Sequence, residues 1–133
     1  MTYGEPMTYT EFNQSDKKVF KNFYNGILPS LILWIISKED IHGYGIMKKL
    51  NDLFNFDQYT VNVNSSKIYP ILSRLEKNGF IAGEWKINES NKSVKFHSIT
   101  DEGNEFLKVI QNQLQIVFKN PVWKAFFDEM TGQ

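Results

Sequence analysis

The fold is decided by residues 65–79, which read SSKIYPILSRLEKNG. Four apolar residues recur here at the i, i+3, i+4 and i+7 spacing of one helix face: Ile68, Ile71, Leu72 and Leu75. Asn64 or Ser65 can cap the start of this helix, and Gly79 suits the left-handed residue that ends one. The pattern therefore predicts an amphipathic helix that runs to about Asn78.

The apolar period changes from 3.6 to 2 directly after this helix. Residues 80–87 and 94–99 alternate apolar and polar side chains, and the polar stretch from Asn88 to Ser93 lies between them. This pattern predicts a β-hairpin.

Two further helices are predicted upstream. Apolar residues recur at helical spacing from about Asp16 to Ile36, and we expect Pro29 to kink this segment or split it into two helices. A second helix is predicted from after Gly43 to about Phe54, and residues 55–64 are expected to form a loop or short strand.

The hairpin is followed by a long helix. Thr100 is expected to cap it, Pro121 to break the chain, and Val122 to Met130 to form a last short helix. Three helices closed by a hairpin form a winged helix-turn-helix. The predicted fold class is mainly α with a small β-hairpin, in three parts: a flexible arm (1–15), a winged-helix domain (16–99) and C-terminal dimerisation helices (100–133).

Composition excludes several classes of protein. The chain has no cysteine, so it has no disulfide framework, thiolate metal site or cysteine nucleophile. The longest apolar run, from Ile27 to Ile36, is too short to span a membrane, and we find no secretory signal, so we expect a cytoplasmic protein. The only histidines, His42 and His97, have no catalytic motif of acids or nucleophiles around them, and we expect no enzyme activity, metal or cofactor.

The charge is unevenly distributed along a chain whose formal net charge is zero. Between His42 and Thr100, eight basic and five acidic residues give a net charge of +3. Because DNA affinity depends on a local basic surface rather than on the total charge, this distribution is compatible with DNA binding.

The outward face of the helix at residues 65–77 has the composition of a recognition helix. Ser65 and Ser66 lie at its start, and the remaining polar or charged outward residues are Lys67, Ser73, Arg74 and Lys77. Hydroxyls, cations and free backbone N–H groups bind phosphates and base edges. The alternative is an ordinary solvated helix face. In the hairpin, Lys92 and Lys95 are candidate phosphate contacts, with an ordinary polar hairpin as the alternative.

Several motifs in order resemble those of one family, the PadR-like winged-helix regulators. His42-Gly43-Tyr44 resembles the family's HGY motif, and residues 67–81 (KIYPILSRLEKNGFI) resemble its LYPxLxRLExxGLI pattern. Glu84-Trp85 and residues 95–103 (KFHSITDEG) follow, the latter similar to KYYxLTxEG. The resemblance covers about residues 27–110 and implies a DNA-binding transcriptional regulator.

The resemblance also implies site residues. By position, the DNA contacts would be Tyr69 together with Ser66, Lys67, Arg74, Lys92 and Lys95. Family wings read GRPRK where this chain has Asn91-Lys-Ser-Val-Lys95, so one arginine is replaced by lysine and another by Val94. This predicts a weaker salt dependence than a full arginine wing gives.

The long helix resembles the family's dimerisation helix. Its apolar stripe suits helix–helix packing, although the same stripe could close the core of a single copy. Because the first helix is also apolar nearly all round, we expect a homodimer. The residues assigned to its interface are Phe23, Ile27, Phe106, Ile110, Leu114 and Val117. Some multidrug-sensing members carry a tryptophan where this chain has Leu114, so an aromatic drug trap there is not supported.

The sequence thus predicts a homodimeric DNA-binding regulator, of the repressor type, whose partner is double-stranded DNA. A winged helix that serves as a protein–protein interaction module is the alternative. The sequence does not identify a small-molecule effector or an operator.

Overall fold

The computed structural model describes residues 14–54 and 63–133, and the side chains among them from residue 24 onward, Phe54 excepted. The elements along the chain are α1 (Gln14–Lys38), β1 (Ile41–His42), α2 (Gly43–Phe54), α3 (Ser65–Lys77), β2 (Ile81–Ile87), β3 (Ser93–Ile99), α4 (Asp101–Lys119) and α5 (Pro121–Met130). The predicted arm at 1–13 and most of the predicted loop at 55–64 lie outside the described residues.

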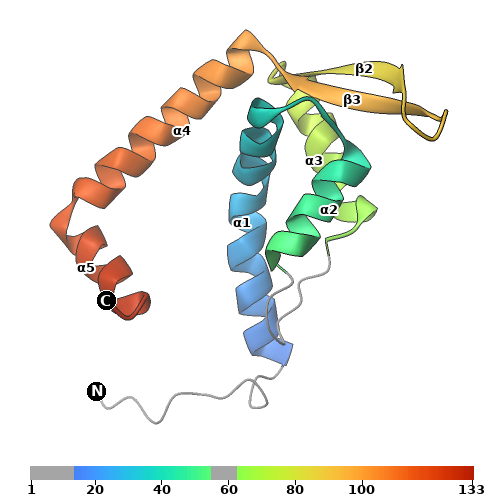
Figure 1. Ribbon diagram of the computed structural model, residues 1–133. Helices are drawn as coiled ribbons and strands as arrows, with labels where there is room; N and C mark the ends of the chain where they lie inside the picture. The colour runs from blue at the N-terminus through green and yellow to red at the C-terminus, as the bar shows by residue number, and fades with distance from the viewer. Residues whose placement is uncertain (1–13, 55–62) are drawn as a thin grey trace.

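The core lies where α1, α2 and α3 meet, below the hairpin (Figure 1). Residues at helical spacing on α1 supply its centre, and Ile46, Leu50, Ile68 and Leu72 of the next two helices pack against them. The members from α1 are Tyr24, Leu28, Ile32, Leu33, Ile35 and Ile36. Burial of this much apolar surface is the main force that holds the three helices together.

Pro29 lies inside one continuous α1, so of the two predicted outcomes, a kink or a split into two helices, the split does not occur. A proline in a helix interior removes one backbone hydrogen bond and costs about 3 kcal/mol. Leu28, Ile32 and Leu33 around it are almost completely buried, and their burial offsets that cost.

The sheet has three antiparallel strands in the order β1-β3-β2. The predicted hairpin is present, and its pairing runs from Ile81 with Ile99 to Ile87 with Ser93, so Ser93 belongs to β3 and not to the loop as predicted. The two-residue strand β1, which pairs Ile41 with His97, was not predicted. It joins the start of α2 to the centre of the sheet.

A compact corner joins the C-terminal end of α3 to the first turn of α4. Gly79 has a φ of 80°, and Gly79 N–H and Phe80 N–H donate to the carbonyls of Glu76 and Leu75. Thr100 Oγ1 donates to the Gly79 carbonyl at 2.6 Å and accepts from Gly103 N–H at 3.0 Å. Thr100 therefore caps α4, as predicted, and also ties it to the end of α3.

Candidate nucleic-acid interface

One face of α3 is exposed along its whole length. Ile68, Leu72 and Leu75 are buried on the opposite face, as the spacing predicts. The exposed residues are Ser65, Ser66, Tyr69, Pro70, Ser73, Arg74 and Lys77. This face presents hydroxyls at its start and two cations toward its end.

Arg74 and Lys77 carry charges that are available to a partner. Among the described residues, no ion pair involves either side chain, and neither takes part in a hydrogen bond. At the helix start, Asn64 is the N-cap residue but makes no side-chain cap, since its Oδ1 accepts from the Ser66 hydroxyl at 2.5 Å. The first turn therefore keeps backbone N–H groups that a phosphate oxygen can bind.

Lys67 lies at the side of this face rather than at its centre. Its ammonium donates to Asn25 Oδ1 of α1 at 2.9 Å, and the side chain is half-buried. This contact links the start of α3 to α1, an arrangement that the helical spacing did not predict.

The loop of the hairpin has a defined shape. Asn88 Oδ1 accepts from the backbone N–H groups of Ser90 and Lys92, and Asn91 adopts the left-handed conformation with φ 60°. Lys92 is exposed at this loop. Lys95, further along β3, instead forms an ion pair with Glu76 of α3 at 2.9 Å.

A groove of about 420 Å³ lies between the start of α2, α3 and the hairpin. Tyr44 and Trp85 line it beside Tyr69, and all three are more than half exposed. Gly43 makes room for Tyr69, because a Cβ at Gly43 would lie 3.0 Å from the Tyr69 ring. Reasoning from sequence did not assign Tyr44 or Trp85 to the site, although both stand in the motifs that carry the family resemblance.

The two histidines have structural roles. His42 Nδ1 accepts from Gly45 N–H at 3.3 Å, which caps α2, and its ring stacks on Phe96 with centroids 5.1 Å apart. Burial lowers the pKa of His97, the nearby charge of Lys95 lowers it further, and Glu76 acts in the opposite direction. In the described part of the chain, no group of three or more potential ligand residues could hold a metal ion.

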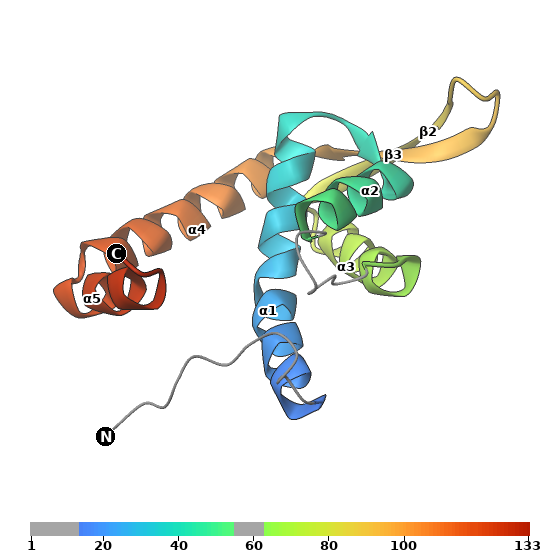
Figure 2. The same ribbon diagram turned by 60° about the horizontal axis from the view of Figure 1, so that its bottom comes forward.

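A second groove, of about 730 Å³, runs between α1 and α4. The two helices lie close together where α4 begins and diverge toward the end of α4 (Figure 2). Apolar and polar side chains line the groove together, and the apolar Ile27, Trp34, Leu114 and Phe118 are each about half exposed. Of the predicted interface residues, Phe106 stacks on Phe80, Ile110 lines this groove, and Val117 is half-buried. The side chain of Phe23 lies outside those described.

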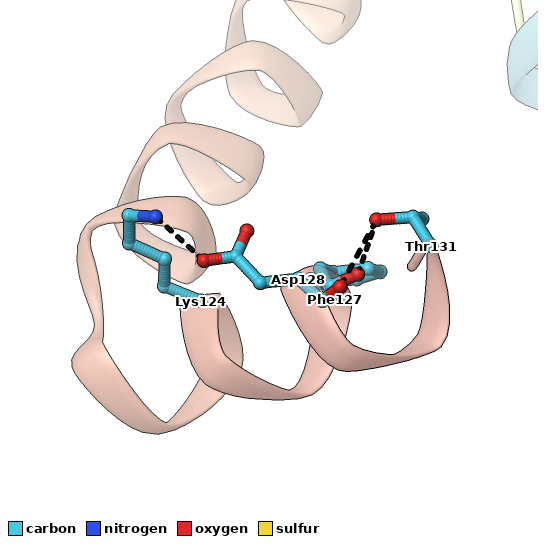
Figure 3. A network of polar contacts seen from close by, with 4 residues as sticks. All are labelled: Lys124, Phe127, Asp128 and Thr131. Carbon is cyan, nitrogen blue, oxygen red and sulfur yellow. Dashed lines mark hydrogen bonds and ion pairs between the residues drawn. The ribbon is translucent and has the colours of Figure 1, made fainter. Parts of the chain in front are cut away.

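Helix α5 extends the apolar surface beyond the end of α4. Its polar side is internally paired, with Lys124 bonded to Asp128 at 2.7 Å and the Thr131 hydroxyl donating to the Phe127 carbonyl (Figure 3). On another side, Val122 and Met130 are at least 70% exposed. In the described part of the chain, no helix is both long and apolar enough to cross a membrane.

Comparison with known proteins agrees with this geometry. Residues 32–109, more than half of the chain, match the model of the Transcriptional regulator PadR-like family. A PadR-like transcriptional regulator from Bacillus cereus has 33% identity and a TM-score of 0.62, over 74% of this chain and 90% of that one. A PadR family regulator from Eggerthella lenta has 28% identity and a TM-score of 0.66, over 82% and 89%.

A curated relative extends beyond the matched region. Transcriptional regulator YqjI of Escherichia coli is 28% identical over 95 residues, which are 71% of this chain and 42% of that protein. The match therefore spans less than half of that relative's length.

The helical core, the hairpin and the exposed cationic third helix together make up a winged-helix fold, which the chain shares with the PadR-like transcriptional regulator from Bacillus cereus. This chain belongs to the PadR-like family of such regulators.

Proposed function

We propose that this protein is a homodimeric repressor that binds a two-fold symmetric DNA site, with one α3 in the major groove of each half-site. The exposed face of α3 carries this proposal, because it gathers hydroxyls, a tyrosine and two unpaired cations on one side of a rigid helix. Repression is the simplest outcome of such binding, since a bound dimer excludes other proteins from the DNA that it covers.

The proposed DNA contacts differ in the chemical group that each residue would bind. Ser65 and Ser66 would bind phosphate or base edges at the helix start, and Tyr69 and Ser73 would face the groove floor. Arg74 suits a guanine edge or a phosphate, and a guanidinium gives two parallel hydrogen bonds to either. Lys77 and Lys92 suit phosphates beside the groove. Lys67 and Lys95 differ from these residues because both ammonium groups are already bonded within the protein.

The groove between α1 and α4 supports the dimer. Its exposed apolar residues Ile27, Trp34, Leu114 and Phe118, together with the exposed Val122, Trp123, Phe126 and Met130 of α5, are large side chains that a partner copy could cover. In a dimer related by a two-fold axis, each α4 would lie in the groove of the other copy. Such an interface would fix the distance between the two α3 helices.

The test is DNA binding by fluorescence anisotropy over a salt series. The DNA is the region upstream of the protein's own gene, with an unrelated duplex of equal length as the reference. We expect tighter binding to the upstream DNA, and Arg74→Ala should weaken it at least tenfold because each dimer loses two contacts of about 1–3 kcal/mol each.

Lys124→Ala is the control, because Lys124 is also an exposed cation but lies on α5, away from α3 (Figure 1). It should bind as the wild type does, and both variants should sediment as dimers. Equal affinity for the two duplexes at moderate salt would contradict sequence-specific regulation and favour a protein-interaction role instead.

A further inference from the structure

Lys95 and Glu76 connect the hairpin to the recognition helix. Lys95 Nζ on β3 lies 2.9 Å from Glu76 Oε2 in the last turn of α3. Both side chains are about two-thirds buried, at 34% and 37% exposure, so this pair is shielded from solvent more than the other ion pairs of the described chain. Shielding from water strengthens the attraction between the charges.

Gly83 on β2 opens the path for this pair. A Cβ at Gly83 would overlap Lys95 Cε and would lie 3.0 Å from Glu76 Oε1. The Lys95 chain therefore passes over β2 at the one point where that strand carries no side chain. Trp85, the cross-strand neighbour of Lys95, lines the groove between the hairpin and α3.

The two lysines of the hairpin thus stand in different surroundings. Lys92 is exposed at the loop, and no ion pair of the described residues includes it. Lys95 points back toward the protein, and a phosphate could bind its ammonium only in competition with Glu76. The sequence does not reveal this difference, because both residues are lysines with the same charge.

We propose that Lys95 and Glu76 are positioning residues, which hold the hairpin at a fixed distance from α3, and that Lys95 makes no phosphate contact. This inference rests on the proposed DNA-binding function. The position of the hairpin sets the width of the groove between the hairpin and α3. One strand of DNA must fit into this groove, so the pair acts on DNA affinity through geometry rather than through its own charge.

The first experiment compares Lys95→Met with Lys92→Met by anisotropy over a salt series. Each lysine that contacts a phosphate occurs twice in a dimer, so Lys92→Met should reduce the slope of log affinity against log salt by about 1.8. Lys95→Met should weaken binding about fivefold and leave that slope unchanged. A slope reduced by about 1.8 in Lys95→Met would overturn the inference.

The second experiment uses the acidic partner. Glu76→Gln removes a negative charge near the DNA, which by charge alone would tighten binding. The inference predicts weaker binding by about fivefold, and recovery to within twofold of wild type in the exchanged pair Glu76→Lys with Lys95→Glu. Tighter binding by Glu76→Gln, or no recovery in the exchanged pair, would contradict it.

The third experiment needs no DNA, and so separates this inference from the proposed function. Amide hydrogen exchange of the free protein should be faster in the hairpin for Lys95→Met than for wild type, and unchanged for Lys92→Met. Gly83→Ala should act as Lys95→Met does, because the new Cβ displaces the flexible end of Lys95 while both charges remain. Unchanged exchange in both variants would refute the positioning role even if DNA binding itself is confirmed.

Discussion

At the scale of single residues, His97 combines a buried position with a titratable ring. It lies at the centre of the sheet, opposite Ile41 on one side and Gly83 on the other, and only 5% of its surface is exposed. Among the residues that the structure describes, its Nδ1 has no hydrogen-bond partner. Protonation would add a charge beside Lys95, so the folded protein favours the neutral ring.

This burial predicts a dependence of stability on pH. Because the pKa of His97 is below its ordinary value of 6.5 in the folded state, the unfolded chain binds the proton first as the pH falls. The free energy of unfolding should be constant above pH 7 and decrease below 6.5, by at most about 1.4 kcal/mol per pH unit from this group. Urea unfolding of wild type and His97→Phe between pH 7.5 and 5.5 tests this. An equal decrease in both would exclude His97 as its source.

The sequence predicts which residues of α3 are exposed, but it does not predict which cations are free. The 3.6-residue period places Arg74 outward and Leu72 inward correctly. The partners of Lys67 and Lys95, however, lie 42 and 19 residues away along the chain. Side-chain pairing over such separations follows from tertiary packing, which no local pattern encodes.

At the scale of elements, the predicted helices and hairpin are confirmed because their apolar periods are strong. The differences arise where a local rule is overridden. Burial of α1 on the core outweighs the cost of Pro29, and β1 is too short, at Ile41–His42, to show any period. The HGY motif predicts a helix start, and its His42 supplies the cap through Nδ1.

The corner between α3 and α4 allows a direct test at this scale. A Cβ at Gly103 would overlap the Phe80 carbonyl oxygen, a backbone atom that cannot move without disturbing the turn at Gly79. Gly103→Ala should therefore lower the free energy of unfolding by about 1–3 kcal/mol. Glu105→Ala, at an exposed neighbouring position outside the groove between α1 and α4, should change it by less than about 0.5 kcal/mol. Urea denaturation measures both, and equal stabilities would mean that α4 does not pack closely on this corner.

At the scale of the whole molecule, the proposed DNA-binding surface and the proposed dimer surface lie on different sides of the core. The helix α3 and the hairpin form one, and α1, α4 and α5 form the other (Figure 2). The sequence predicted an apolar stripe on α4 but left open whether it closes the core of a single copy. Leu107 does pack against that core, whereas Leu114 further along remains half exposed.

The central claim is that two copies of α3, held apart by the dimer, read one symmetric site. Selection of binding sites from random duplexes tests it most directly, with wild type, Leu114→Glu and Asn112→Glu. Both variants add one negative charge to α4, but only Leu114 lines the groove between α1 and α4. Wild type and Asn112→Glu should enrich two inverted half-sites about 10–10.5 base pairs apart, or a multiple of that spacing, since the two α3 helices must meet the same face of the DNA. Leu114→Glu should enrich a single half-site or none. The account would be contradicted if the duplexes enriched by wild type shared no sequence, or if Leu114→Glu enriched the same two-fold site as wild type.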